Sequence, residues 1–474
     1  MTENIVLFFE LHQPIRLKRL SAFTPPNIPL EFDDMIDFEA NNKILARVVE
    51  RTYRKATKIL IDAASEVPGF KFTMSVAGVL LEALRKDYPD VIELLSTAVS
   101  KGIMEPVAQT YYHSLASLID ENEFIDQVRA QADLVADVLG FRPVVAENTE
   151  FIYNNDIGCL LYRNGFKAVV TEGVEWALGW RSPNYVYLNP LCGVRLLLRN
   201  YRLSDDIGFR FGDRNWDQYP LTADKYARWV SESPGDLVLV AVDFETFGEH
   251  HWPESGIYEF LRWLPRELGK RGVNFLTVSS AAELTPKGIY DVPPWSTISW
   301  ADAKDLGAWL GNEMQRKAFE VLRRYYFFAR AVGGKTLERW RILSTSDHFY
   351  YMATKGGPEG AVHSYFSHLG SPYEAYLAFS YALYALGREI RMALQREPCL
   401  LVNVNLPREL CFHLKEGSQV CSLGLLPDLM AEVGGDQAAV AQVKRWVGEV
   451  FGVELESALE LAKRCKGAYE ASQY

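Results

Sequence analysis

Cysteine is scarce in this sequence: six residues in 474, scattered, with no CxxC pair. A zinc site or a dense disulfide framework needs cysteines at paired spacings, and none is present. We therefore expect reduced, mostly buried thiols at all six positions. These positions are Cys159, Cys192, Cys399, Cys411, Cys421 and Cys465.

Long hydrophobic runs and basic runs are also missing. The longest apolar stretches, such as residues 237–242, have the length of a strand, which argues against a membrane span. The net charge of −11, without a basic run, argues against nucleic acid and anionic membranes as partners. The N-terminal stretch carries Glu3 and no basic segment, so it indicates a strand rather than a signal peptide. We expect a cytoplasmic protein with a neutral substrate.

Two motifs of cofactor and metal enzymes are absent as well. No GxGxxG follows the first apolar run, which disfavours a dinucleotide-binding fold. Four histidines, at positions 12, 113, 250 and 251, lack HExxH or any other ligand spacing. We therefore expect no metal site.

The sequence does contain a regular alternation of strand and helix patterns over the first 290 residues or so. Continuous apolar strands separated by helices predict a parallel sheet covered on both faces. Seven such units predict a closed or nearly closed barrel, with an insertion near 180–215 that can form a hairpin. The expected strands are 4–9, 71–76, 104–109, 143–147, 167–171, 237–243 and 274–278.

The pattern changes after a proline-rich break at 286–294. Residues 303–333 and 373–396 are long helical patterns rich in Ala, Leu, Tyr and Arg, which predict a helical bundle. A short apolar run at 400–405 predicts a strand before helix returns. The expected domains are therefore a catalytic barrel over 1–290, a helical domain over 291–400 that covers the active site, and an extension over 401–474 without an assigned role.

Polar clusters follow four of the expected strands, where parallel barrels carry their catalytic groups. They occupy residues 10–14, 109–114, 146–156 and 242–252. Asp243 and Glu245 in the last cluster point to the same side of an extended chain. Mutual repulsion would raise the pKa of one carboxyl, which suits a general acid. The alternative for this cluster is a solvated loop whose acids cap a helix.

Paired carboxylates on separate strands, surrounded by aromatic residues, indicate glycosidic bond cleavage. One carboxyl protonates the leaving oxygen, and the other attacks the anomeric carbon or stabilises its charge. Glu150 and Glu147 compete for the second role. His12 and His113 are candidate donors to sugar hydroxyls, although lone histidines are often structural.

An ordered set of motifs resembles glycoside hydrolase family 57: HQP at 12–14, TYYHSL at 110–115, NTEFIYNND at 148–156 and VDFETFGEHHW at 242–252. Later segments, including STSDHFYYM at 344–352, are similar to the α-amylase-type branch. The resemblance covers about residues 1–400. It implies an incomplete (β/α)7 TIM-like barrel followed by a C-terminal helical bundle that closes over the site. It also implies a retaining double displacement without a cofactor.

The resemblance also implies roles for individual residues. Glu150 matches the nucleophile and Asp243 the acid/base. Gln109 and Glu147 depart from the family pattern. In that pattern we expect an acidic residue at position 109 and a basic residue at position 147. These departures would retune specificity without removing catalysis. The remaining substrate-binding candidates are His12, Glu245, His250 and Asp347, then Arg202, Asp206 and Trp252, and Trp300 or Trp309 from the helical region.

The leading hypothesis is an α-amylase-type hydrolase of α-1,4-glucans, with an α-glucan or maltooligosaccharide as its partner. A 4-α-glucanotransferase or a branching enzyme would use the same covalent intermediate and differ only in the acceptor. An α-galactosidase also fits the family. A non-catalytic carbohydrate-binding homologue would have lost one carboxylate, and here both are present.

Overall fold

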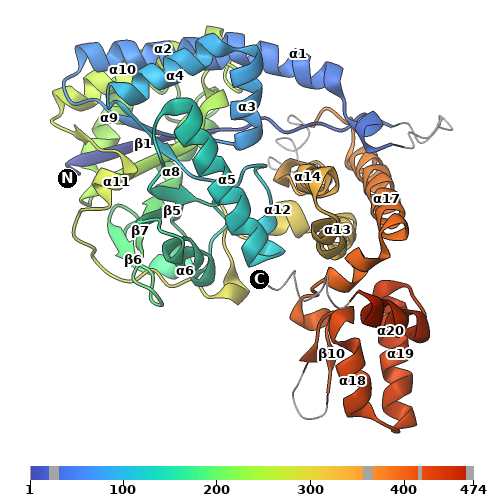
Figure 1. Cartoon of the computed structure of the whole chain (residues 1–474). Helices are drawn as coiled ribbons and strands as arrows, with labels where there is room; N and C mark the ends of the chain where they lie inside the picture. The colour runs from blue at the N-terminus through green and yellow to red at the C-terminus, as the bar shows by residue number, and fades with distance from the viewer. Residues whose placement is uncertain (1, 21–30, 356–366, 415–418, 466–474) are drawn as a thin grey trace. The chain divides into compact units, whose positions relative to one another are not determined.

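The computed structural model describes residues 2–20, 31–355, 367–414 and 419–465 (Figure 1). The chain forms two compact units, and each is built from several stretches of sequence. The first contains residues 1–16, 36–315 and 344–372; the second contains 17–35, 316–343 and 373–474. This division differs from the expected one, because residues 291–315 and 344–372 belong with the barrel.

Seven parallel strands form the sheet of the first unit, in the order β3-β2-β1-β8-β7-β5-β4. An isolated parallel bridge between Ala108 and Ala146 joins the two ends, so the barrel is nearly closed. The predicted (β/α)7 TIM-like barrel is confirmed, with helices around the strands (Figure 1). The strands are β1 (Asn4–Leu11), β2 (Phe72–Val76), β3 (Met104–Val107), β4 (Val145–Glu147), β5 (Ala168–Glu172), β7 (Arg195–Arg199) and β8 (Leu237–Asp243).

One barrel strand lies where we expected an insertion. Residues 186–188 form β6 (Val186–Leu188), which pairs antiparallel with β7 as the expected hairpin does. However, β7 also pairs in parallel with β5 and β8 and is therefore part of the barrel. The run expected at 274–278 contributes only β9 (Asn274–Phe275), which pairs with β1. A strand can form hydrogen bonds with a second strand on each of its two edges. A hairpin pattern in the sequence identifies the partner on one edge only.

Alternate residues of the strands face two separate cores. Ile5, Leu7 and Phe9 of β1 pack with the helices outside the barrel. Val6 and Phe8 pack with inward side chains of the other strands. Because successive side chains of a strand point to opposite faces, the residue after Phe9, Glu10, continues the inward series. Its register partner on β8 is Asp243, which places two acidic residues side by side at the same end of the barrel.

The helices of the first unit alternate with the barrel strands along the chain, as the sequence pattern predicts. A π-helical turn, η2 (Val49–Tyr53), separates α1 from α2, and such turns often occur at functional sites. The main helices are α1 (Phe38–Val48), α2 (Arg54–Glu66), α3 (Gly78–Asp87), α4 (Pro89–Ser100), α5 (Glu121–Leu139), α6 (Asn155–Arg163), α8 (Tyr201–Gly208), α9 (Ala223–Glu232), α10 (Ile257–Lys270) and α15 (Ser346–Tyr350).

The second unit is mostly helical, as its sequence predicts. The strand expected at 400–405 is wrong, because this run lies largely in a 3-10 helix, η8 (Pro398–Asn403). Among the described residues, no helix is both long and apolar enough to span a membrane. The long helices are α13 (Glu313–Val332), which begins in the first unit, and α14 (Gly334–Leu343), α17 (Pro372–Arg396), α18 (Leu426–Val433), α19 (Gln437–Phe451) and α20 (Leu455–Arg464).

The expectation of free thiols is wrong. All six cysteines are paired, as Cys159–Cys192, Cys399–Cys465 and Cys411–Cys421. The partners are 33, 66 and 10 residues apart in sequence, so only the fold brings them together. Spacing alone therefore gave no sign of the pairing.

Candidate active site

A cavity of about 930 Å³ opens in the first unit and gathers most of the predicted residues. Its size suits a ligand of several sugar rings or a drug-sized molecule. The cavity includes both carboxylates that we expect to be catalytic. The predicted residues that line it are Glu150, Asp243, His12, His113, Glu245, His250, Trp252, Trp300, Trp309 and Asp347.

Glu150 lies just after β4, in a short turn where its backbone adopts the left-handed conformation, with φ of +60°. A non-glycine residue held in this region costs free energy, and such residues cluster at functional sites. Trp300 Nε1 donates to Glu150 Oε2 at 2.7 Å, and Ser346 Oγ donates to Oε1 at 2.7 Å. Both carboxyl oxygens of Glu150 therefore accept hydrogen bonds from neutral donors, which fixes the orientation of the group.

Asp243 is the last residue of β8, and its surroundings favour the protonated form of its carboxyl group. Burial raises the pKa of Asp243 to about 8, and the negative charges of Glu245 and Glu150 add to the effect. No hydrogen bond to the Asp243 carboxyl is found among the described residues. Asp243 therefore keeps its proton at neutral pH, and that proton is free to be donated.

Glu245 is the other carboxyl group of this cluster that could act as the acid, but its side chain already accepts hydrogen bonds from the protein. The Tyr53 hydroxyl donates to Glu245 Oε1, and Gln13 Nε2 lies 3.3 Å from the same oxygen. Burial raises the pKa of Glu245 to about 7, against the effect of these hydrogen bonds. Tyr53, which sits in the π-helical turn, was not singled out by the sequence because it lies within a helical pattern.

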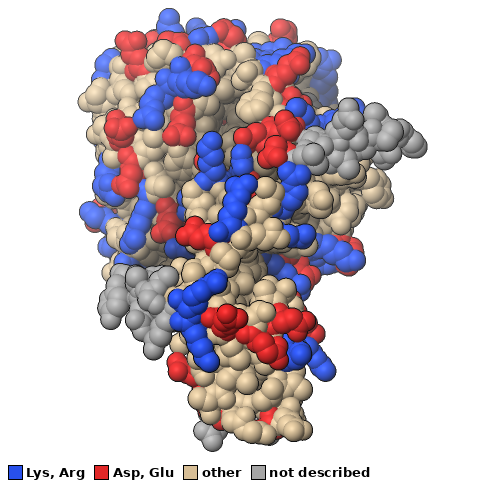
Figure 2. All heavy atoms as spheres, turned by 45° about the vertical axis from the view of Figure 1, so that its right-hand side comes forward, with Lys and Arg blue, Asp and Glu red and all other residues tan. Residues whose placement is uncertain are grey.

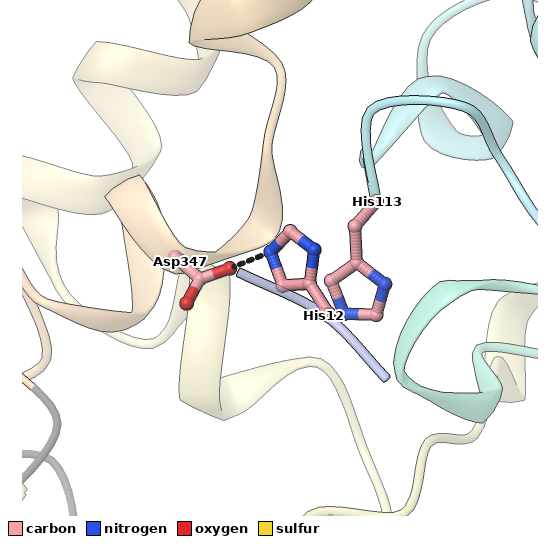
Figure 3. A group of neighbouring side chains, drawn as sticks. All are labelled: His12, His113 and Asp347. Carbon is pink, nitrogen blue, oxygen red and sulfur yellow. Dashed lines mark hydrogen bonds and ion pairs between the residues drawn. The ribbon is translucent and has the colours of Figure 1, made fainter. Parts of the chain in front are cut away.

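His12 and His113 stack with ring centroids 4.0 Å apart, and Asp347 lies beyond His12 (Figure 3). His12 Nε2 and Asp347 Oδ2 are 2.8 Å apart. Burial, together with His113, lowers the pKa of His12 to about 4, so His12 is neutral and donates to Asp347. Burial alone would raise the pKa of Asp347, but His12 outweighs this and holds it well below its usual range. The buried Nδ1 of His12 has no partner among the described residues and can accept a hydrogen bond from a ligand.

The same three side chains are the only candidate cation group found in the described part of the chain, with donor atoms within 4.8 Å of one another. The two rings lie nearly parallel, with an interplanar angle of 22°. Asp347 is already bonded to His12 (Figure 3). This arrangement suits hydrogen bonding to hydroxyl groups, and the expected lack of a metal stays a prediction.

Arg199 forms a buried ion network, which the sequence did not reveal, next to Trp300. Arg199, at the end of β7, contacts Glu172 at 3.0 Å and Asp205 at 2.7 Å. Its guanidinium also lies over the ring of Trp300, 5.7 Å from the centroid. Arg199 thus holds the indole that donates to Glu150. We missed this role because residue 199 fell within the supposed insertion.

Two predicted substrate-binding residues lie outside the cavity lining. The Arg202 side chain is 74% exposed and pairs with Glu175 on the surface. Asp206 pairs with Arg210 at 2.6 Å, whereas its neighbour Asp205 lines the cavity. The substrate-binding roles of Arg202 and Asp206 remain predictions, and the positions of these two side chains do not support them.

Comparison with known proteins decides the family. Residues 6–293 match the family model described as "Glycosyl hydrolase family 57". The chain belongs to this family. As a family 57 member, it is a carbohydrate-active enzyme of the glycoside hydrolase type.

The relatives of this family 57 enzyme carry three different names. A Methanocaldococcus jannaschii protein named "Putative alpha-amylase" is 42% identical over 393 residues, covering 80% of this chain and 83% of the relative. A 4-alpha-glucanotransferase from Thermococcus litoralis is 23% identical over 260 residues, covering 52% of this chain and 38% of that protein. A family 57 branching enzyme from Thermococcus kodakaraensis has the same fold, with a TM-score of 0.60 at 14% identity over 91% of this chain and 94% of that structure.

Proposed function

We propose that this enzyme hydrolyses α-1,4-glucosidic bonds of α-glucans with retention of configuration, as an α-amylase does. The observation that carries the proposal is the contrast between two carboxyl groups in one cavity. Both oxygens of Glu150 accept hydrogen bonds, from Trp300 and Ser346, whereas burial raises the pKa of Asp243 to about 8. A retaining mechanism needs an ionised nucleophile and a protonated acid at the same time.

In the first step, Glu150 attacks the anomeric carbon and forms a covalent glycosyl ester. The bond to the leaving oxygen breaks, and Asp243 gives its proton to that oxygen. The negative charge of Glu150 helps to raise the pKa of Asp243. When Glu150 forms the ester, it loses this charge, so the pKa of Asp243 falls and the loss of its proton becomes easier.

In the second step, the ionised Asp243 takes a proton from water, and the resulting nucleophile attacks the glycosyl ester. Glu150 leaves as a carboxylate, again stabilised by the hydrogen bonds from Trp300 and Ser346. Two inversions at the same carbon give net retention.

Several features of the cavity suit a neutral, hydroxyl-rich polymer. The unpartnered Nδ1 of His12 offers a buried acceptor, and the buried indole Nε1 of Trp309 offers a donor without a partner among the described residues. Phe209 and Trp252 line the cavity and are 55% and 59% exposed, as expected of rings on which sugars stack. On the outer face shown in Figure 2, Lys and Arg side chains are interspersed with Asp and Glu side chains.

Glucan transfer is the second candidate, because relatives are named glucanotransferase and branching enzyme. The same glycosyl ester would then be attacked by a sugar hydroxyl in place of water. The exposed rings of Phe209 and Trp252 could hold such an acceptor.

The test is to incubate the enzyme with maltoheptaose, size the products and record their first anomer by proton NMR. Shorter oligomers released in the α form support retaining hydrolysis. Longer and shorter oligomers together mean transfer. The β anomer as the first product would overturn the retaining mechanism.

A further inference from the structure

Lys304 has no place in the mechanism above, although its backbone is held in an uncommon conformation. It lies in the left-handed region, with φ of +55°. Glycine adopts this conformation at little cost, whereas a residue with a long side chain is kept there by its surroundings. The Lys304 side chain is 16% exposed and does not line the cavity. Any influence of Lys304 on the substrate is therefore indirect.

The ammonium group of Lys304 lies among three groups from different segments of the chain. Its Nζ donates to Glu172 Oε2 at 3.0 Å and to the backbone carbonyl of Trp300 at 3.3 Å. It also lies over the ring of Tyr201, 4.5 Å from the centroid. Glu172 is fully buried at the end of β5. The amine thus joins the backbone of Trp300 to the end of a barrel strand.

Glu172 has a second cation as its partner. Arg199 Nη1 donates to the same oxygen, Oε2, at 3.0 Å, and the backbone N–H of Gly173 donates to Oε1 at 2.9 Å. The guanidinium of Arg199 lies over the indole ring of Trp300. One buried carboxylate therefore binds two cations that contact different parts of Trp300. Arg199 contacts its ring, and Lys304 contacts its carbonyl oxygen.

The chain before Trp300 is attached to the turn that carries Glu150. Tyr153 and Ile298 exchange backbone hydrogen bonds at 3.0 and 2.9 Å, and the Trp300 N–H donates to the Glu150 carbonyl at 3.1 Å. After Trp300 the chain turns and brings the Lys304 amine back to the Trp300 carbonyl. The backbone of Trp300 is thus held at its N–H by the turn and at its carbonyl by the amine.

We propose that Lys304 is a positioning residue that holds the Trp300 indole in the orientation from which it donates to Glu150. It does so through its bonds to Glu172 and to the carbonyl of Trp300. An indole has one N–H, and its hydrogen bond weakens steeply when the donor turns away from the acceptor. Loss of the amine would free the carbonyl of Trp300 and let the indole turn. The proposal rests on the proposed role of Glu150 as nucleophile.

Variants of the full chain can separate this role from a general effect on the fold. Lys304→Met keeps a long side chain and removes the amine. Lys304→Gly also removes the amine but relieves the left-handed backbone, so it covers the case in which Lys304→Met does not fold. Lys304→Arg restores a cation. Lys287→Met, at an exposed lysine that pairs with Asp236 at 3.2 Å, is the matched control.

The indole can be observed directly by NMR of protein labelled at the tryptophan indole nitrogen. The signal of Trp300 is assigned by its loss in Trp300→Phe, and a hydrogen bond to a carboxylate shifts the indole proton downfield. We expect Lys304→Met and Lys304→Gly to move this signal upfield or to broaden it. Lys304→Arg should restore part of the wild-type shift, and Lys287→Met should leave it unchanged. An unchanged signal in both variants that lack the amine would overturn the proposal.

The kinetic test is a double-mutant cycle with Trp300→Phe. We expect Lys304→Met to lower kcat for maltoheptaose about tenfold, with little change in KM, because Lys304 does not line the cavity. In the Trp300→Phe background, which lacks the indole N–H, the same substitution should lower kcat less than about twofold. Equal losses in the two backgrounds would show that Lys304 acts on the fold in general, and would overturn the proposal.

The NMR measurement does not depend on turnover, so the two proposals can fail separately. If the glucan-hydrolase assignment is wrong, maltoheptaose is not cleaved, while the indole signal of Trp300 still responds to loss of the amine. If the role of Lys304 is wrong, maltoheptaose is cleaved, and the indole signal stays the same in Lys304→Met and Lys304→Gly.

Discussion

Trp300 donates its indole N–H to Glu150 across 2.7 Å, and its ring lies under the guanidinium of Arg199. The carboxyl group of Glu150 is thus oriented by a side chain that itself packs against a buried cation. This relationship joins residues 150 positions apart in sequence, and it fixes one carboxyl oxygen of Glu150 while the other is held by Ser346.

The first prediction concerns this indole. Trp300→Phe keeps an aromatic ring and removes the donor, and a hydrogen bond to a charged group contributes about 1.5–3 kcal/mol. We expect kcat to fall by about tenfold to a hundredfold. Trp295→Phe, at a ring that is 86% exposed, is the matched control and should retain the wild-type rate. Equal rates for both variants would show that the indole N–H has no part in catalysis.

The second prediction separates the roles of the two carboxylates by azide rescue. With an activated aryl α-glycoside, Asp243→Ala still forms the glycosyl ester, because that leaving group needs no proton. Azide then attacks the ester without needing a base and gives a product of retained configuration. In Glu150→Ala, azide can only attack the substrate itself and would give inversion. The product configurations are read by NMR, and the opposite pattern would exchange our two assignments.

The third prediction is the high-pH limit of activity. Asp243 must be protonated to act as the acid, and its pKa is raised to about 8. The kcat/KM for maltooligosaccharides should therefore be high below pH 8 and fall as the pH rises through this value. The aryl glycoside, which needs no proton for its first step, serves as the control and should show no such fall. A decline at the same pH for both substrates would point to another group.

The fourth prediction extends the same pKa to stability. From the ordinary value of 3.8 up to about 8, the unfolded chain releases the proton of Asp243 while the folded chain keeps it. Folding stability from this group is full below pH 3.8 and falls with rising pH, by at most about 1.4 kcal/mol per unit, until the folded state also ionises. Asp243→Asn removes this loss. Its melting temperature should exceed that of the wild type by a margin that grows between pH 4 and pH 8, and a constant margin would contradict the assignment.

The fifth prediction concerns the disulfides. Denatured but unreduced protein should show no free thiol with a thiol reagent, and reduced protein should show six. Because a disulfide typically contributes about 2–4 kcal/mol, reduction should lower the melting temperature. Cys159→Ser with Cys192→Ser should lower it in the absence of reductant as well. Free thiols in the unreduced sample would restore the interpretation drawn from sequence.

The barrel and the positions of Glu150 and Asp243 could be predicted from sequence because both depend on local patterns. Apolar runs mark strands, and polar residues directly after them mark the active end of a parallel barrel. The partners of these carboxylates could not be found in this way. Tyr53 lies within a helical pattern. Arg199 ends β7, and the hairpin pattern in the sequence did not show that this strand also pairs with β5 and β8. Glu147 competed with Glu150 in the sequence, and only the fold shows that Glu147 is fully buried at the end of β4.

The order in which the chain builds the first unit has a consequence for its biogenesis. Ser346 and Asp347, which contact Glu150 and His12, belong to this unit, although residues 316–343 before them belong to the other. A gene fragment cut after the last barrel strand would thus encode every strand as well as Glu150 and Asp243, and still lack the Ser346 hydroxyl that donates to Glu150. During synthesis, the ribosome must pass residue 347 before the catalytic centre can be completed. Until then, the nascent barrel is an unfinished enzyme.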